Sequence, residues 1–403
     1  MKYFLTLISF LLLLNCKQEK QTIKLQDGIY RGVLELQDNE ILPFNFEVKS
    51  DSTVIIFNAE ERIEINDISY KNDSVFIKFP VFEGVLVAKI ESNELNGVFI
   101  KESVERVVPF SAEFNNSVRF FAENATNTNI EGVWETIFSE GTDDAYIAKG
   151  IFYQQNNHVT GTFRTTTGDY RFLDGVLDGD TLKLSAFDGA HAFYFKAKVT
   201  DSTMNGYFYS GNHWKEPFTA RINPNYELPD AYSLVQLNDD YNTVDFSFPN
   251  ANGNIVSLSD DLFKDKVVVV QLMGTWCPNC LDESRYFSDY TNNRKSDNVE
   301  FVALAFEHDK TPEQAFEKIN KLQNRLNLKY PILLAQYGGI NKKSAQQKLP
   351  MLSEVMSYPT MIIIDKKKNV RKILTGFNGP ATGDKFTEFK NEFESFLAEL
   401  AVE

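Results

Sequence analysis

The chain has 403 residues, which is too long for a single hydrophobic core and indicates two or three domains. Its composition, 43% hydrophobic and 24% charged, excludes an intrinsically disordered chain. The formal net charge of −15 gives an acidic surface that repels phosphate backbones, so nucleic acid is not expected as a partner.

The chain begins with the pattern of a targeting segment. Lys2 supplies a positive charge, and the apolar run 4–14 that follows is too short to span a bilayer. The run leads into Leu-Leu-Asn-Cys ending at Cys16, which resembles a bacterial lipobox, where the cysteine becomes the lipidated first residue. We predict a lipoprotein signal peptide over 1–16, a polar tether over 17–21 and a lipid-anchored location in the cell envelope, facing the periplasm or the surface. The alternatives are a plain signal peptide with a coincidental cysteine and a short transmembrane anchor.

The cysteine count is informative because the chain contains only Cys16, Cys277 and Cys280. If Cys16 carries lipid, one close pair remains. An exported protein held together by structural disulfides would contain more cysteines. The pair is therefore predicted to be present for its chemistry.

The segment 22–223 has the pattern of antiparallel β structure. Strand-like runs alternate with Asp-Gly and Asn-Gly dipeptides, which suit the positive φ angles of hairpin turns. The two halves of the segment also look related. LNGVF at 95–99 aligns with MNGYF at 204–208, and GIY at 28–30 aligns with GVW at 132–134.

This repeat predicts two related antiparallel units, 22–120 and 121–223, of about 100 residues each. They are expected to be two barrels or sandwiches, or two halves of one closed structure, because closure removes exposed strand edges. The alternative is chance similarity between β proteins rich in Asn-Gly turns. Neither unit contains clustered carboxylates, metal-ligand spacing or a phosphate-binding glycine loop, so we expect a scaffold or a docking site for a partner.

Proline-containing turns near 224 and 229 mark a linker over 224–245. From 246 the pattern changes to strand, helix and strand, which predicts an α/β domain over 246–403. The predicted fold class is therefore multidomain, with an N-terminal all-β antiparallel repeat followed by an α/β domain.

The cysteine pair lies in a pattern that activates a thiol. The apolar run 267–273 predicts a strand buried on both faces, and a helix is predicted to begin at Pro278, since proline suits the first helical position. Cys277 would then lie at the helix N-terminus, where free N–H groups and the helix dipole stabilise a thiolate. Cys280 lies one turn on. We predict that Cys277 attacks and that Cys280 resolves the mixed disulfide.

Two other interpretations of the pair remain. A zinc site usually needs four ligands, but the third cysteine lies in the lipobox and the four histidines have no paired spacing, so no metal is expected. The other interpretation is a purely structural disulfide.

The sequence Trp-Cys-Pro-Asn-Cys at 276–280, after a buried strand, resembles the active-site motif of the thioredoxin superfamily. The most similar group is the exported bacterial reductases of the TlpA and ResA type. The resemblance covers 246–403 and implies a thioredoxin-like domain and an extracytoplasmic thiol–disulfide oxidoreductase, with no cofactor besides the Cys277–Cys280 disulfide. The implied partners are exported thiol or disulfide proteins and an upstream membrane reductant.

The family's second signature is a cis-proline that precedes a strand beside the disulfide, and Ser-Tyr-Pro-Thr at 357–360 matches it. By that similarity Pro359 is expected to be cis and to expose the backbone of Tyr358, with which a substrate strand can pair. The alternative is an ordinary trans proline at the start of a strand. The resemblance implies that Trp276, Pro278 and Tyr358 bind substrate.

Two positions near the cysteines bear on proton transfer. Glu283 lies where the ResA-like group often carries an active-site glutamate, and it would relay a proton or raise the pKa of Cys277 by like-charge repulsion. The alternative is that Asp282 and Glu283 simply suit the first turn of a helix. Gln271 stands where thioredoxin carries a buried aspartate. Because glutamine cannot ionise, no proton relay is expected there.

The segment between the cysteines and Pro359 is longer than in thioredoxin. It predicts a strand at 299–305, a helix at 311–326 and a strand at 331–335, as TlpA-like and peroxiredoxin-like proteins have. A peroxiredoxin-like peroxide reductase is therefore an alternative function. Such proteins usually carry threonine three residues before the attacking cysteine, where this chain has Gly274. A second alternative is a non-catalytic envelope binding protein built on the β units.

Overall fold

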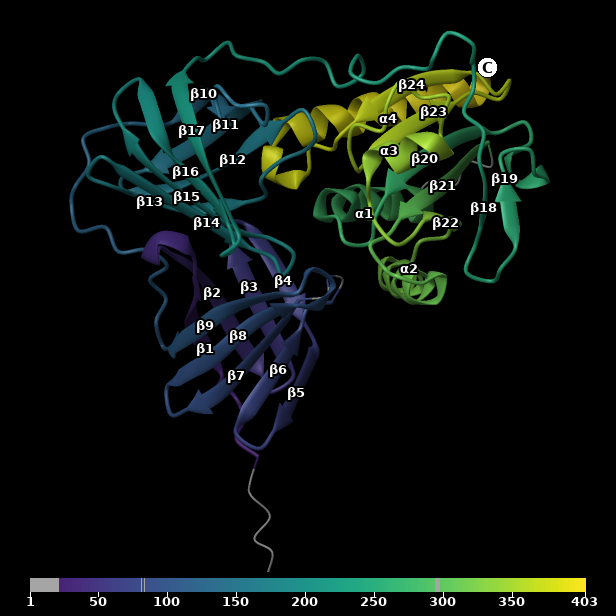
Figure 1. The fold of residues 1–403 in the computed structure, drawn as a ribbon. Helices are drawn as coiled ribbons and strands as arrows, with labels where there is room; N and C mark the ends of the chain where they lie inside the picture. The colour runs from purple at the N-terminus through teal and green to yellow at the C-terminus, as the bar shows by residue number, and fades with distance from the viewer. Residues whose placement is uncertain (1–21, 81, 83, 294–297) are drawn as a thin grey trace, which may run out of the picture.

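The computed structural model describes residues 22–80, 82, 84–293 and 298–403 (Figure 1). The predicted signal peptide, the tether and Cys16 lie outside these described residues. Within them, two antiparallel β units precede an α/β domain, which confirms the predicted fold class. No described helix combines the length and the apolar character that a membrane span requires.

The first unit is an antiparallel sheet whose strands are, in chain order, β1 (Gly28–Glu35), β2 (Ile41–Ser50), β3 (Thr53–Asn58), β4 (Glu61–Ile65), β5 (Asp67–Lys71), β6 (Ser74–Lys78), β7 (Val85–Glu91), β8 (Glu94–Lys101) and β9 (Arg106–Phe114). The spatial order is β4-β3-β2-β1-β9-β8-β7-β6-β5 among the described residues. Its two edge strands, β4 and β5, are therefore consecutive in the chain and separated only by Asn66. Buried and more exposed residues alternate along the strands, as in a sheet with one face on a core.

The second unit is a closed barrel formed by β10 (Gly132–Phe138), β11 (Tyr146–Gln155), β12 (His158–Thr165), β13 (Leu173–Asp178), β14 (Thr181–Phe187), β15 (Ala192–Val199), β16 (Thr203–Ser210) and β17 (Trp214–Ile222). Successive strands pair, and β10 closes the barrel on β17. Aromatic side chains fill the interior, and the rings of Phe163 and Phe195 lie 4.8 Å apart. Closure leaves no unpaired strand edge in this unit.

The segments that align between the two β units occupy equivalent strands. Gly28 and Gly132 each begin the first strand of their unit, and each first strand pairs with the last. The Leu-Asn-Gly and Met-Asn-Gly segments lie in the next-to-last strands, β8 and β16. The units differ in closure, since the sheet order of the first one has two ends.

The two β units share a hydrophobic core. Phe187 at the end of β14 packs into the first unit, where its ring lies 4.5 Å from that of Phe44. Asn58 of β3 pairs with the backbone of Phe187 in both directions, accepting from its N–H at 3.0 Å and donating to its carbonyl at 2.9 Å. The barrel is therefore fixed to the first unit by buried contacts.

The α/β domain contains a sheet in the order β22-β21-β20-β23-β24. All seven residues of the central strand are buried, which explains why all of them but Gln271 are apolar. The elements are β18 (Ser247–Pro249), β19 (Ile255–Ser257), β20 (Val267–Met273), α1 (Pro278–Asn293), β21 (Val299–Phe306), α2 (Pro312–Leu326), β22 (Ile332–Gln336), α3 (Lys342–Lys348), β23 (Thr360–Ile364), β24 (Val370–Thr375) and α4 (Asp384–Val402). The predicted inserted strand, helix and strand correspond to β21, α2 and β22.

The segment 224–245, predicted as a linker, packs against the α/β domain. Val235 and Val244 are buried in the core of that domain, and Leu237 forms an isolated bridge with Leu352. This segment is therefore attached to the domain along much of its length.

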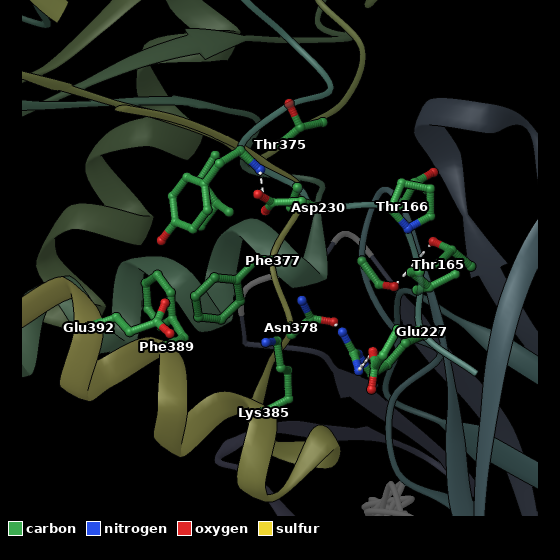
Figure 2. A pocket seen from close by; sticks show the side chains of 17 residues that line it. Thr165, Thr166, Glu227, Asp230, Thr375, Phe377, Asn378, Lys385, Phe389 and Glu392 are labelled. Atoms are coloured by element: carbon green, nitrogen blue, oxygen red, sulfur yellow. Dashed lines mark hydrogen bonds and ion pairs between the residues drawn. The ribbon is translucent and has the colours of Figure 1, made fainter. Parts of the chain in front are cut away.

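The barrel also contacts the α/β domain directly. Arg164 of β12 donates from Nε to Asn378 Oδ1 at 2.9 Å, and the N–H of Gly379 donates to Asp169 at 2.7 Å. Figure 2 shows this junction from close by, around a cavity of about 120 Å³ that Thr165 of the barrel and Phe377 of the α/β domain both line. All three units are thus joined through the barrel (Figure 1).

Candidate active site

Cys277 and Cys280 form a disulfide at the N-terminus of α1, with Cα atoms 5.2 Å apart. The site lies where β20 ends at Met273 and α1 begins at Pro278. Cys277 is 6% exposed and Cys280 is fully buried, so Cys277 is the sulfur that another molecule can reach. The N–H of Cys280 lies 3.2 Å from Cys277 Sγ. Such an N–H at a helix N-terminus stabilises a thiolate at Cys277 after reduction.

The loop before β23 lies against the same sulfur. The peptide bond between Tyr358 and Pro359 is cis, and the carbonyl oxygen of Tyr358 is 3.5 Å from Cys277 Sγ. The rings of Tyr358 and Trp276 meet edge to face, with centroids 5.9 Å apart. Pro278 is buried as the first residue of α1. The structure thus brings the predicted residues Trp276, Pro278, Tyr358 and Pro359 together around the disulfide.

Glu283 is a fully buried carboxyl one turn beyond Cys280. Its Oε2 accepts a hydrogen bond from Gln271 Nε2 at 2.8 Å, and the same nitrogen lies 3.4 Å from the carbonyl of Cys280. Oε1 has no hydrogen-bond partner among the described residues. Burial raises the pKa of Glu283 to about 8, so the carboxyl keeps its proton near neutral pH. Neither Glu283 nor Asp282 lies in the first turn of α1.

We expect Glu283→Gln to weaken the dependence of the unfolding free energy on pH between about 4.5 and 8. In the unfolded chain the carboxyl ionises near 4.5, whereas the folded protein retains the proton up to about 8, so wild-type stability falls as pH rises through this window. Glutamine has no proton to lose and can still accept the hydrogen bond from Gln271. Denaturant unfolding between pH 4 and 9 should show the variant gaining on wild type as pH rises.

The control for this experiment is Glu317→Gln on α2, where the side chain is exposed. It should follow the wild-type pH trend. A constant offset between Glu283→Gln and wild type across the whole range would contradict a raised pKa at Glu283.

Glu307, which the sequence analysis missed, holds the loop that precedes the cysteines. It follows β21 directly, is 1% exposed, and accepts hydrogen bonds from Thr275 N at 2.8 Å and Thr275 Oγ1 at 2.7 Å. Burial raises the pKa of Glu307 to about 7. The carbonyl of the preceding residue, Phe306, accepts a hydrogen bond from Trp276 Nε1 at 2.9 Å. The available signal was its position after a strand parallel to β20, because the carboxyl ends of parallel strands gather functional loops.

A second feature that the sequence analysis missed is Arg171, a barrel residue that reaches the active-site helix. Its buried guanidinium pairs with Asp282 on α1, with Glu61 on β4 at 2.6 Å and with Asp188 at 3.4 Å. Burial alone would lower the pKa of Arg171, but these carboxylates hold it above its usual value. One guanidinium thus contacts all three units. Its partner on α1, Asp282, lies two residues after Cys280.

The α/β domain is similar in sequence to known proteins. Residues 239–391 match the Redoxin family. Thiol-disulfide oxidoreductase ResA from Geobacillus kaustophilus (strain HTA426) is 27% identical over 132 residues, which cover 33% of this chain and 66% of that protein. The ResA of Bacillus subtilis (strain 168) is 27% identical over 131 residues, which cover 32% and 64%. The α/β domain belongs to the thioredoxin superfamily, in its TlpA/ResA-like group.

The match between this thioredoxin-like domain and the two ResA proteins spans less than two thirds of their own length. Among solved structures, a thiol-disulfide oxidoreductase from Bacteroides fragilis NCTC 9343 is similar, with 18% identity and a TM-score of 0.27, covering 37% of this chain and 99% of that one. Among the residues that the structure describes, no group of three or more His, Cys, Asp or Glu side chains is arranged to hold a metal ion. Thioredoxin-like oxidoreductases use their own disulfide as the redox centre.

Proposed function

We propose that the protein is an extracytoplasmic, membrane-tethered thiol–disulfide oxidoreductase that reduces disulfides of exported proteins. The observation that carries the proposal is the Cys277–Cys280 disulfide at a helix N-terminus, with one sulfur reachable and the other buried. A structural disulfide would have no need of this asymmetry, nor of the Tyr358 backbone beside the reachable sulfur.

The reaction proceeds by two exchanges. In the reduced protein, the Cys277 thiolate attacks one sulfur of a substrate disulfide, that bond breaks, and the other substrate sulfur leaves as a thiolate and takes a proton. Cys280 releases the proton that this first substrate thiolate takes up and attacks Cys277 Sγ, so the mixed disulfide breaks, the second substrate sulfur leaves as a thiolate, and the Cys277–Cys280 disulfide forms. Two electrons pass to the substrate, and a dithiol donor must return them. The neutral carboxyl of Glu283 avoids a like charge beside the thiolates.

The proposed location is the bacterial cell envelope, with a lipid on Cys16 and the thioredoxin-like domain outside the cytoplasm. Support comes from the lipobox-like sequence that ends at Cys16 and from the presence of only one further cysteine pair. In that location the partners are exported thiol or disulfide proteins and a membrane dithiol reductant.

The full-length protein is expected to accelerate the reduction of insulin by dithiothreitol and to leave hydrogen peroxide unconsumed. Gly274 stands where a peroxiredoxin usually carries threonine, and the hydroxyl of Thr275 already donates to Glu307. Parallel insulin-turbidity and peroxide-consumption assays check this. Fast peroxide consumption with intact insulin would favour a peroxide reductase, and inactivity in both assays would favour a non-catalytic binding protein.

A further inference from the structure

A cleft of about 730 Å³ opens on the disulfide, and the β units form its second wall. The thioredoxin-like domain contributes Trp276, Cys277 and Tyr358 to one wall. The barrel contributes Tyr170 and Phe193 to the facing wall. The barrel lies outside residues 239–391, so the family match assigns no role to this second wall.

The barrel turn 165–168 packs directly on the active-site motif. A Cβ atom added to Gly168 would lie 1.9 Å from Nδ2 of Asn279, the residue directly before Cys280 in the Cys-Pro-Asn-Cys motif. The turn is held by a hydrogen bond from the N–H of Thr165 to the carbonyl of Gly168 at 2.7 Å. A broad folded surface therefore cannot reach the slightly exposed Cys277 from this side, whereas a narrow segment can enter the cleft.

The two walls of the cleft are rich in aromatic side chains. On the barrel side the ring of Phe193 lies 4.2 Å from that of His191 and 5.2 Å from that of Tyr170. On the other side Trp276 and Tyr358 present their rings beside the sulfur. Aromatic faces such as these favour the apolar side chains of an extended peptide, and the cleft is also lined by hydroxyl groups, among them those of Thr165, Thr166 and Ser357.

Cations line the rim of the cleft. Lys101 and Arg106 come from the first β unit and Lys342 from α3. Neither Arg106 nor Lys342 forms an ion pair with any residue that the structure describes. Burial, together with the charges of Arg106 and Lys101, lowers the pKa of the neighbouring His213 to about 4, as expected where the local potential is positive.

The carboxylates at this wall hydrogen-bond to other groups and not to Arg106 or Lys342. Asp169 lines the cleft but is buried, and it accepts hydrogen bonds from the N–H groups of Arg171 and Gly379. Glu216, behind Tyr146, accepts from Tyr146 OH at 2.7 Å and from Ser139 at 2.8 Å. The cleft therefore has the positive charges of Arg106 and Lys342 at its rim and aromatic surface inside.

We propose that this cleft binds an extended polypeptide segment that carries an acidic side chain near its cysteine. The acidic side chain lies toward Arg106 and Lys342, apolar neighbours pack on the aromatic walls, and the cysteine meets Cys277. The proposal rests on disulfide exchange at Cys277 and specifies its substrate class. A small acidic disulfide such as glutathione disulfide matches the charge of the rim but lacks apolar side chains for the walls.

The test compares two peptides that differ only in whether glutamate or lysine flanks their single disulfide. We expect the full-length protein to reduce the glutamate peptide with a kcat/KM about tenfold higher, which corresponds to one partly buried charge contact. The double variant Arg106→Glu/Lys342→Glu should reverse this preference, and Arg106→Gln/Lys342→Gln should remove it. Because both peptides are measured on one preparation, a loss of folded protein cancels from the ratio.

Lys367→Glu, an equal charge change on the exposed turn between β23 and β24, is the control and should keep the wild-type ratio. Equal rates for the two peptides in wild type, or a ratio unchanged by charge reversal, would overturn the proposal. So would a higher kcat/KM for glutathione disulfide than for the glutamate peptide. Hydroxyethyl disulfide, a small uncharged substrate, distinguishes an error in the substrate class from an error in the proposed function. If wild type reduces it without discriminating between the peptides, only the substrate class is wrong. If wild type reduces none of these disulfides, the proposed function fails as well.

Discussion

Cys277→Ser is expected to abolish disulfide reduction, whereas Cys280→Ser should turn the protein into a covalent trap for its substrates. Serine supplies no thiolate at pH 7, and Cys277 is the sulfur of the pair that a substrate can reach. Without Cys280 behind it, a mixed disulfide on Cys277 has no internal thiol to release it. Insulin reduction should fall to the uncatalysed rate in both variants, but non-reducing electrophoresis should show adducts only for Cys280→Ser.

The double variant Cys277→Ser/Cys280→Ser is the control, because it also lacks the disulfide and should form no adduct. Any stability lost with the disulfide is therefore common to all three variants. Adducts on Cys277→Ser and none on Cys280→Ser would reverse the two roles and contradict the argument from the helix N-terminus. Adducts recovered from cell envelopes by dithiothreitol would identify the exported partners by their own cysteines.

The thioredoxin-like domain could be predicted because its signals are local in the sequence. The run 267–273, apolar except for Gln271, indicates an element buried on both faces, and Pro278 marks the start of α1. The predicted inserted strand at 299–305 lies within β21 (Val299–Phe306) for the same reason. Each of these elements is specified by residues that are neighbours in the chain.

The shapes of the β units could not be predicted from alternation alone. Alternating buried and exposed residues suit a barrel and a sandwich equally, since both have one face on a core. Closure of the second unit depends on pairing between β10 and β17, whereas the first unit ends at β4 and β5. Even the core is shared across units, because Phe187 of the barrel packs against Phe44. No short sequence pattern carries that information.

The parts of the site that the sequence did not reveal are contacts between distant residues. Arg171 and Asp282 are 111 positions apart, and Thr275 and Glu307 are 32 apart. Asn279 was visible as a residue between the cysteines, but its contact with Gly168 joins different units. Single charged residues and glycines of this kind look like ordinary surface or turn positions until the fold brings them together.

Arg171→Met is expected to lower the unfolding free energy by about 3–5 kcal/mol. The Arg171 side chain is 5% exposed and forms ion pairs with Asp282, Asp188 and Glu61, which come from all three units. Methionine fills similar space without charge and removes the cation that these buried carboxylates share, so that Glu61 loses its ion pair, Asp282 keeps only Arg285 and Asp188 keeps only His191. Urea unfolding at pH 7 measures the loss, with Trp134 in the barrel and Trp276 at the disulfide as fluorescent reporters.

Arg221→Met is the matched control. Arg221 pairs with Glu135 at 2.9 Å, but its side chain is 70% exposed, so the same substitution should change stability by no more than about 0.5 kcal/mol.

The stability deficit of Arg171→Met should also shrink between pH 7 and pH 5. Carboxylates that have lost the guanidinium gain raised pKa values, so the folded variant binds more protons than its unfolded state and becomes more stable as pH falls. Adding Asp282→Asn should recover part of the loss, because it removes one of the buried negative charges that the guanidinium no longer balances. If Arg171→Met lost no more unfolding free energy than Arg221→Met at pH 7, contacts other than this guanidinium would hold the β units against α1. The same contacts would then hold the second wall of the cleft beside Cys277.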